Sequence, residues 1–381
     1  MNETHDVVAL TRRLIAFDTI NPPGNEQACA EYLRDILAAA GFETDLHALG
    51  AGRASLVARL GGGANGSDPL CFTGHIDTVP LGAQPWTRDP FAGEIVDGKL
   101  YGRGSTDMKG GVAAFVIACI VEAERLRDGP GVVLVITAGE ETGCDGAAAL
   151  ARDGRIGRAG AMVVAEPTSN YPYVGHKGAL WLKALTQGVT AHGSMPERGD
   201  NAVYKAARVI DRLADFDFNV ARHPVLGKPT LNVGTVHGGM NINSVPDRTE
   251  IGIDIRTIPG IAHAPLREGL RSYIGEGADL DVMVDLDSVW TDPAIPWMVR
   301  ASAIAGHLTG EAVEPRTATY FTDASVLTPA YGGIPTLILG PGEPGMAHQT
   351  DEYCVVDRLP QAVTIYRALI ADWVGAPETA A

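Results

Sequence analysis

The chain has 381 residues, of which 45% are hydrophobic and 20% charged, and its formal net charge is −16 at pH 7. This composition is that of a folded globular protein, and the excess of acidic residues argues against nucleic acid or an anionic membrane as a partner. Because the N-terminus shows no signal peptide and the five cysteines form no C-x-x-C pair, we expect a cytoplasmic protein without a disulfide framework.

The first part of the chain alternates helices with apolar strands. Apolar periodicity and turn residues predict, in chain order, helices at 7–17 and 25–40, strands at 54–60 and 69–73, a helix at 108–126, a strand at 131–138, a helix at 144–152 and a strand at 161–165. The Gly-rich stretch between the first two strands is interpreted as a hairpin loop. Strands that alternate with helices favour a three-layer α/β sandwich.

The pattern changes after residue 177. The predicted elements are then a strand at 180–188, a helix at 201–213, strands at 230–237 and 248–256, a helix at 264–274 and a strand at 280–287. This βαββαβ order is ferredoxin-like. An α/β pattern returns with a helix at 296–308, a strand at 336–339 and a helix at 358–374. We therefore expect a small α+β domain, 178–292, inserted into a discontinuous domain of 1–177 and 293–381.

Acidic and imidazole side chains follow several of the predicted buried strands. His75 and Asp77 alternate on one face of an extended segment, where a carboxylate could hold the second nitrogen of a metal-bound imidazole. The alternative is a strand-end histidine beside a turn aspartate. Asp107 precedes the long helix and could equally be a helix cap.

Three further segments carry candidate ligands. Glu140 and Glu141 follow the most apolar strand, and two adjacent carboxylates there are costly unless they are paired or coordinated. Glu166 ends another apolar strand, and His348 closes a Gly/Pro loop after a third. Each has an ordinary alternative. The two adjacent glutamates could lie in a surface turn, Glu166 could be an acid that ends a strand, and His348 could be a loop histidine with no special role.

Taken together, these residues indicate a metal site at the carboxyl ends of one α/β sheet, where such folds bind ligands. Nitrogen and carboxylate ligands without thiolates suit zinc or another borderline divalent ion, and two ions about 3.5–4 Å apart could share one carboxylate. A phosphate-binding loop is disfavoured, because the Gly-x-Gly at 102–104 lacks a third glycine. There is no G-x-S-x-G elbow, and no base is evident for a Cys144 nucleophile.

Seven ordered motifs carry a family resemblance that runs nearly end to end. They are GHIDTVP (74–80), YGRGSTDMKGG (101–111), GEETG (139–143), AEPTS (165–169), TAHGS (190–194), DIRTIPG (254–260) and AHQTDEY (347–353). With them the sequence resembles the M20 metallopeptidase and deacylase family. The resemblance implies a three-layer zinc-peptidase-like catalytic domain and a zinc-dependent hydrolase of linear amides.

The resemblance also implies a ligand set for two zinc ions, for which Co²⁺ or Mn²⁺ could substitute. His75, Asp107 and Glu166 correspond to the ligands of one ion. Asp107, Glu141 and His348 correspond to the ligands of the other, so that Asp107 bridges the pair.

The remaining catalytic roles follow from the same resemblance. Glu140 corresponds to the general base, which takes a proton from the metal-bridging water and passes it to the departing amine. Asp77 corresponds to the partner that orients His75. The family also leads us to expect a cis peptide bond after Asp107, a rare feature before a residue other than proline.

The inserted domain corresponds to the family's lid, through which relatives form homodimers. His192 stands where relatives use an imidazole that polarises the scissile carbonyl in the partner's site. Arg256 corresponds to a clamp for the substrate carboxylate and Asn243 to a residue that contacts the substrate. From the residues alone, His192 is a surface-loop histidine and Arg256 a salt-bridged strand arginine.

The substrate is expected to be a small N-acyl-L-amino acid, with acetylornithine first. WTRDPF (86–91), HKG (176–178) and PTLNVGTVHGG (229–239) resemble the acetylornithine deacetylase branch, whereas 320–325 and MNINSVPD follow the broader family. The alternatives are a succinyl-diaminopimelate desuccinylase or another N-acyl amino acid deacylase, a dipeptidase or carboxypeptidase, and a non-catalytic binding protein of the same fold.

Overall fold

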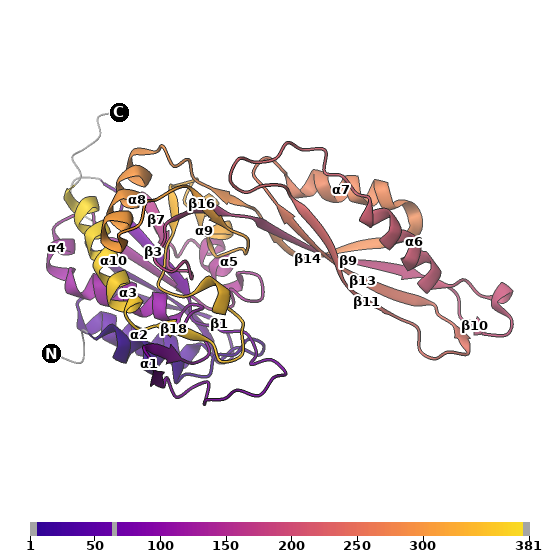
Figure 1. Cartoon of the computed structure of the whole chain (residues 1–381), viewed down its shortest axis with the longest axis horizontal. Helices are drawn as coiled ribbons and strands as arrows, with labels where there is room; N and C mark the ends of the chain where they lie inside the picture. The colour runs from indigo at the N-terminus through magenta and orange to yellow at the C-terminus, as the bar shows by residue number, and fades with distance from the viewer. Residues whose placement is uncertain (1–5, 63–66, 376–381) are drawn as a thin grey trace. The chain divides into compact units, whose positions relative to one another are not determined.

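The structure of the chain is a computed structural model that describes residues 6–62 and 67–375. The chain divides into two units, each with its own apolar core. One unit holds the described residues up to Gly175, Trp290–Arg316 and those from Thr322 onward (Figure 1). The other holds His176–Val289 and Thr317–Phe321.

A nine-stranded mixed sheet is the centre of the first unit. Its order is β1 (Glu43–Gly50), β2 (Arg53–Leu60), β6 (Val132–Thr137), β3 (Leu70–His75), β7 (Ala161–Val164), β17 (Thr336–Ile338), β8 (Tyr173–His176) and β15 (Val289–Trp290), with β16 (Arg316–Ala318) paired to β8. Strands β6, β3, β7 and β17 are parallel, and every residue in them is buried. Their continuous apolar runs suit strands that are covered on both faces.

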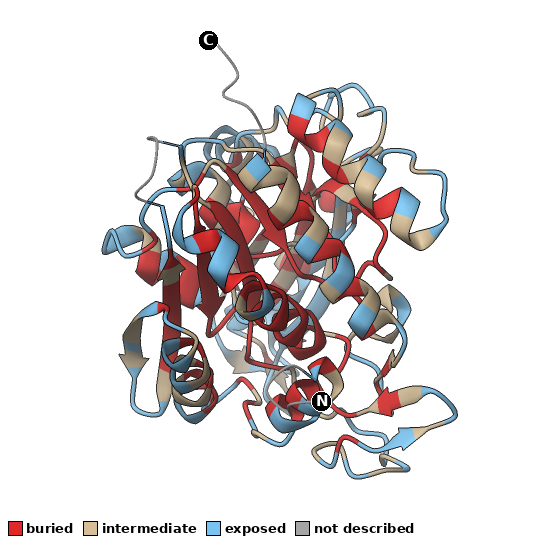
Figure 2. Ribbon diagram, turned by 90° about the vertical axis from the view of Figure 1, so that its left-hand side faces the viewer, coloured by how far each residue is buried: buried red, intermediate tan, exposed pale blue. Residues whose placement is uncertain are grey.

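Helices cover both faces of this sheet. On one face α1 (Val7–Ile15), α2 (Gln27–Ala39), α3 (Lys109–Val121), α8 (Pro296–Thr309) and α10 (Arg358–Gly375) share one core with the strands. On the other face α5 (Asp145–Arg152) packs against α9 (Ala324–Ala330) (Figure 1). Figure 2 shows the buried strands between helices whose outer faces are exposed. The predicted three-layer α/β architecture is therefore confirmed.

Two local predictions were wrong. Strands β2 and β3 do not form a hairpin, because β6 lies between them, antiparallel to β2 and parallel to β3. A Gly-rich loop predicts a reversal of the chain but not whether a later strand enters the gap; its residues 63–66 lie outside the described residues. The helix predicted at 108–126 is interrupted at Glu122, where α3 gives way to the short α4 (Ala123–Arg127).

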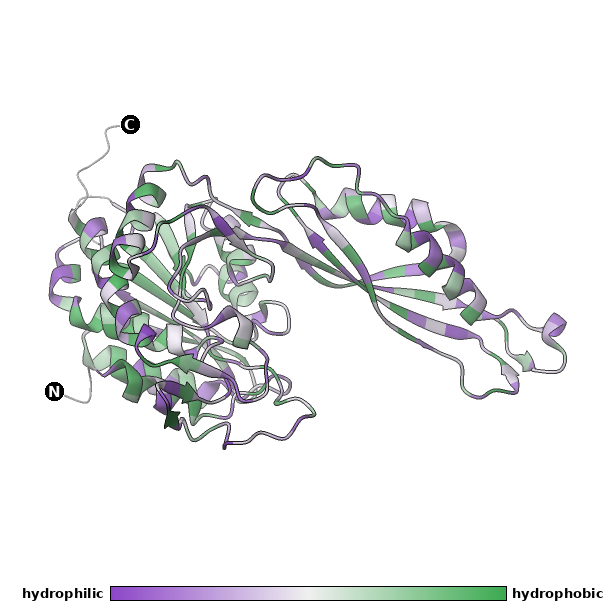
Figure 3. Cartoon of the chain, viewed as in Figure 1, coloured by the Kyte–Doolittle hydropathy of each residue, from purple (hydrophilic) through white to green (hydrophobic). Residues whose placement is uncertain are grey.

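The second unit has the predicted βαββαβ order. Its elements are β9 (Gly178–Gln187), α6 (Ala202–Ala214), β11 (Thr230–Gly238), β13 (Arg248–Thr257), α7 (His263–Ile274) and β14 (Asp279–Leu286). The sheet is antiparallel in the order β11-β13-β9-β14. Buried and partly exposed residues alternate along β13, and its isoleucines pack with apolar residues of α6 and α7. Figure 3 shows the matching alternation of hydropathy along these strands.

Short elements complete the structure. A three-stranded sheet joins β18 (Tyr353–Val355), β5 (Lys99–Tyr101) and β4 (Ile95–Val96), and β10 (Ala191–His192) pairs with β12 (Ser244–Val245). Turns of 3₁₀ helix lie at Pro196–Arg198, Gly275–Gly277 and Pro344–Met346. Among the described residues, none of the helices has both the length and the apolar character needed to span a bilayer.

Candidate metal centre and surrounding residues

The parallel strands bring the candidate ligands to one edge of the sheet. His75 is the last residue of β3, the Glu140–Glu141 turn follows β6, and Glu166 comes two residues after β7. His348 lies in the loop that follows β17. Because parallel strands end at the same edge, residues far apart in the chain are neighbours here.

Asp107 lies between the two imidazoles. Its Oδ1 is 3.1 Å from Nε2 of His75, and its Oδ2 is 3.4 Å from Nε2 of His348. Nε2 of His75 is also 3.8 Å from Oε1 of Glu166, and Nε2 of His348 is 3.1 Å from Oε2 of Glu141. The five predicted ligands are thus side by side in two groups that share Asp107. The peptide bond between Asp107 and Met108 is cis, as expected.

Asp77 lies beside His75 and also contacts the turn that follows β6. The Nδ1–H of His75 donates to the backbone carbonyl oxygen of Asp77 at 3.0 Å, while the carboxylate Oδ1 is 3.5 Å away. This bond orients the ring so that Nε2 of His75 faces Asp107 and Glu166, where it could act as a ligand. The buried carboxylate of Asp77 accepts the backbone N–H groups of Glu140 and Glu141, each at 3.2 Å. Asp77 therefore holds the turn that carries both glutamates.

The carboxylates around the imidazoles shift their protonation. Burial alone lowers the pKa of His75, but hydrogen bonds to Asp107 and Asp77 raise that pKa well above its ordinary value. Hydrogen bonds to Asp107 and Glu141 raise the pKa of His348 to about 10. Burial works against ionisation of Asp107, yet its bonds to His348 and His75 hold its pKa below the ordinary value.

The remaining acids are held in an environment that disfavours their charge. Burial raises the pKa of Glu140 and of Glu166 well above the ordinary value, and neighbouring carboxylates add to the effect. Burial and the charge of Asp107 also raise the pKa of Glu141. The Oε1 atom of Glu141 is buried and has no hydrogen-bond partner among the described residues. Excess buried carboxylate, an unpartnered oxygen and two imidazole nitrogens form a donor set that fits zinc.

Two residues that the sequence did not single out support this centre. Asn21 donates to Oδ2 of Asp77 at 3.0 Å and to Oγ1 of Thr142 at 3.1 Å. It lies in the segment between α1 and α2, where no sequence pattern marks a site residue. Asp323 accepts the hydroxyl of Thr137, and its burial raises its pKa to about 6. The available signal was its place in the segment 320–325, which follows the pattern of the broader family.

The predicted residues of the second unit lie on its strands and loops. His192 ends β10, is exposed, and has Nδ1 2.8 Å from Oγ of Ser194. Asn243 lies beside it, because its backbone oxygen accepts the N–H of Gly193 at 2.7 Å. Arg256, on β13, has Nε 2.9 Å from Oδ1 of Asp254.

Arg256 also has aromatic neighbours within the second unit. Its guanidinium carbon is 5.8 Å from the ring centroid of Trp181 and 6.0 Å from that of Phe321. Asp254 engages only Nε, and neither terminal nitrogen of Arg256 has a hydrogen-bond or ion-pair partner among the described residues. Arg256 thus forms the predicted salt bridge through Nε, and its two terminal nitrogens can donate hydrogen bonds to a ligand.

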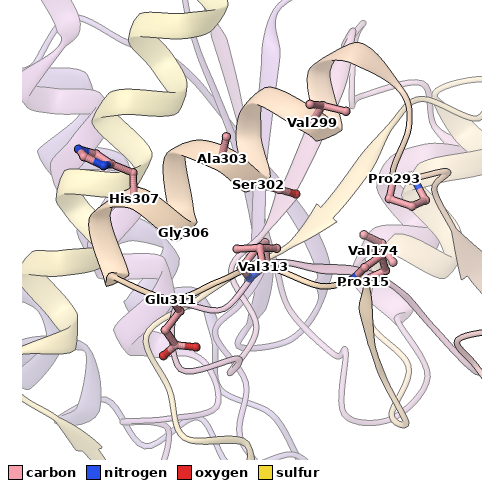
Figure 4. A pocket seen from close by; sticks show the side chains of 11 residues that line it. Val174, Pro293, Val299, Ser302, Ala303, Gly306, His307, Glu311, Val313 and Pro315 are labelled. Carbon is pink, nitrogen blue, oxygen red and sulfur yellow. The ribbon is translucent and has the colours of Figure 1, made fainter.

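A separate apolar pocket lies along α8 (Figure 4). Val299, Ala303 and Gly306 line one side, and Val313 and Pro315 lie across from them. It contains none of the predicted catalytic, metal-binding or substrate-binding residues. We therefore place the candidate centre at the acid–imidazole cluster.

Comparisons with known proteins show to which family the chain is similar. Residues 71–372 match the profile of peptidase family M20/M25/M40. The chain is 31% identical to a "Probable succinyl-diaminopimelate desuccinylase" of Staphylococcus epidermidis over 395 residues, covering 95% of this chain and 96% of that protein. It is also 31% identical to an "Acetylornithine deacetylase" of Photorhabdus laumondii over 362 residues, covering 91% of each.

A solved structure shows the same fold. An M20 family metallo-carboxypeptidase from Sulfolobus solfataricus superposes with a TM-score of 0.80 at 17% identity, covering 96% of this chain and 98% of that one.

Proposed function

Because the chain belongs to peptidase family M20/M25/M40 and is therefore a metal-dependent amidohydrolase, we propose that it cleaves the acyl group from an N-acyl-L-amino acid. The observation that carries the proposal is the placement of Asp107 between two imidazoles, each with its own glutamate. Acetylornithine is the first candidate substrate, so that acetate and a free amino acid are the products.

Two divalent ions fit this donor set. His75, Asp107 and Glu166 would hold one, and Asp107, Glu141 and His348 would hold the other. Zinc suits these nitrogen and oxygen donors, and Co²⁺ or Mn²⁺ could replace it. When bound, the ions supply Lewis acidity, which lowers the pKa of a water molecule and polarises a carbonyl oxygen.

Glu140 is proposed as the general base. Glu140 is 5% exposed, and its backbone N–H donates to the carboxylate of Asp77. A buried carboxylate with carboxylates as neighbours binds a proton more tightly than one in water. Glu140 is thereby suited to take a proton from the attacking water and to deliver it to the departing amine.

The second unit is proposed to bind the substrate. Asp254 holds Nε of Arg256, which leaves the two terminal nitrogens for a bidentate pair with the α-carboxylate. His192 would donate a hydrogen bond to the scissile carbonyl of the partner's site, and Asn243 beside it would contact the substrate.

We propose a homodimer formed through the second unit, which would act as the lid. Met240 and Ile242 are 78% and 103% exposed in this unit, next to Asn243. Exposed apolar side chains near a functional segment are typical of a protein–protein contact.

A second candidate substrate is N-succinyl-diaminopimelate. It is favoured by the identity of 31%, over 95% of this chain, with a protein named as a probable desuccinylase. A dipeptidase or carboxypeptidase activity would use the same cluster. Each differs in the group that must fit beside the metals: a small acetyl, an acidic succinyl or an aminoacyl residue.

The test is amine release by the zinc-loaded protein from N-acetylornithine, N-succinyl-diaminopimelate, other N-acyl amino acids and dipeptides. A preference in kcat/KM for an N-acyl amino acid supports a deacylase, and its acyl group identifies the branch. A higher kcat/KM for dipeptides would contradict the deacylase proposal and indicate a peptidase. No turnover of any amide by protein with its full metal content would indicate a non-catalytic binding protein.

A further inference from the structure

A buried carboxylate lies behind the loop that presents Asp107. Glu352 is fully buried, and its Oε1 accepts the backbone N–H groups of Thr106 at 2.8 Å and Asp107 at 3.0 Å. Its Oε2 accepts the N–H of Gly104 at 3.1 Å and Nη1 of Arg103 at 2.7 Å. One carboxylate therefore gathers four donors from five consecutive residues.

Both oxygens of Glu352 are used in this way, so Glu352 is not a metal ligand. The side chain of Arg103 is equally buried, and its Nη2 donates to the carbonyl oxygen of Pro80 at 3.1 Å. The indole ring of Trp86 covers the guanidinium, with its centroid 5.2 Å from the central carbon. Charge-assisted hydrogen bonds of this kind hold the loop firmly in place. A backbone N–H that lost its bond to Glu352 would stay buried without a partner, which costs free energy.

The same network links the two segments that carry Asp107 and His348. Glu352 lies four residues after His348, and its backbone oxygen accepts the N–H of Gly102 at 2.9 Å. The hydroxyl of Thr106 donates to the carbonyl oxygen of Tyr353 at 2.6 Å. The distance between Asp107 and His348 therefore depends on how the loop before α3 sits on residues 352–353.

We propose that Glu352 is a positioning residue, which sets the place of Asp107 relative to His348 and so creates the ion site formed by Asp107, Glu141 and His348. The inference rests on the proposed two-ion function. His75 lies on β3 and Glu166 follows β7, whereas in the described part of the chain the hydrogen bonds of Glu352 all go to the loop of residues 102–107. Asp107 belongs to both ion sites, but His348, which lies four residues before Glu352, belongs to only one of them. Loss of Glu352 should therefore weaken the site with His348 more than the site with His75.

The experiment is a calorimetric titration of metal-free protein with Zn²⁺ and with Co²⁺, compared between wild type and Glu352→Gln. Glutamine has nearly the size of glutamate, but its NH₂ group takes the place of one carboxylate oxygen. The two N–H donors that this oxygen accepted then face another donor and lose their hydrogen bonds. Changing a partner that orients a metal ligand typically weakens metal binding about 10–100-fold. We expect a weakening of that size for one ion, a smaller change for the other, and an altered visible spectrum of the Co²⁺ form.

Glu122→Gln is the matched control. Glu122 is also a buried acid paired with arginine, at 2.7 Å from Nε of Arg367, but it lies at the opposite end of α3 from Asp107. This variant loses the ion pair between Glu122 and Arg367, whose side chain is 48% exposed. It is expected to lower the melting temperature while both metal affinities stay within twofold of wild type. Equal weakening of metal binding in both variants would mean that general destabilisation, not positioning, explains the result, and would overturn the proposal.

Wild-type affinity for both ions in folded Glu352→Gln protein would also overturn it. If Glu352→Gln does not fold, Arg103→Lys tests the proposal instead. A lysine cannot donate to both Glu352 and the carbonyl oxygen of Pro80, so this variant weakens the same network. We expect weaker binding of the same ion, and unchanged binding would refute the inference. A wild-type protein that binds fewer than two ions would instead refute the two-ion function on which the inference rests.

Discussion

Replacement of Asp77 by asparagine tests how the glutamate turn is held. The carboxylate of Asp77 accepts three hydrogen bonds, from Asn21 and from the backbone N–H groups of Glu140 and Glu141. Asparagine has nearly the same shape but one acceptor oxygen, so its NH₂ group must face at least one of these donors. A buried donor left unpaired costs about 1–3 kcal/mol.

The expected result of Asp77→Asn is therefore a loss of about 1–3 kcal/mol in the free energy of unfolding of the metal-free protein. Displacement of Glu140 should also lower kcat by up to about 10²–10⁴-fold, the usual contribution of a general base. Urea unfolding measures the first effect and amine release the second. Wild-type stability together with wild-type kcat in Asp77→Asn would show that the hydrogen bonds to the turn do not position Glu140.

The remaining predictions concern the proposed base, the second unit and pH. Glu140→Gln should keep its metal content and lose about 10²–10⁴-fold in kcat; activity within tenfold of wild type would remove Glu140 as base. His192→Ala should lower kcat with unchanged zinc content, whereas loss of zinc would make it a ligand. Arg256→Lys should raise KM for substrates with a free carboxylate but not for the matching amides, since lysine offers no bidentate fork. Because the pKa of His348 is raised to about 10, Zn²⁺ must displace a proton and should bind more tightly as the pH rises from 6 to 8; affinity independent of pH would contradict this.

The same shift predicts how pH acts on the metal-free fold. The pKa of His348 is about 10 in the folded state and ~6.5 when unperturbed, so its ion pairs stabilise the fold fully below pH ~6.5. This stabilisation should be lost as the pH rises from ~6.5 through about 10. Melting temperatures of the metal-free protein across that range measure it.

Long apolar patterns made most of the fold predictable. The run of β-branched residues in β6 is typical of a strand covered on both faces, and the alternation along β13 fits a half-buried antiparallel strand. The neighbours of β6 were not predictable, because pairing across the sheet depends on residues distant in the chain. Strand β1 was missed since its residues are polar and partly exposed, as befits the edge of a sheet.

In the candidate site, too, some residues could be predicted from the sequence and others could not. His75, Glu141 and Glu166 stand out because each acid or imidazole follows an apolar strand, and parallel strands end at one edge. The partners of Asp77 and Glu352 are backbone N–H groups, which every residue carries and no sequence pattern marks. Such contacts become visible only once the turns that carry them are folded.

The central claim is that Asp107 bridges two metal ions. Crystals of the zinc-loaded protein, measured at wavelengths on either side of the zinc absorption edge, test it directly. We predict two anomalous peaks about 3.5–4 Å apart, one on each side of the Asp107 carboxylate. A single peak, or peaks that Asp107 does not contact, would contradict the account.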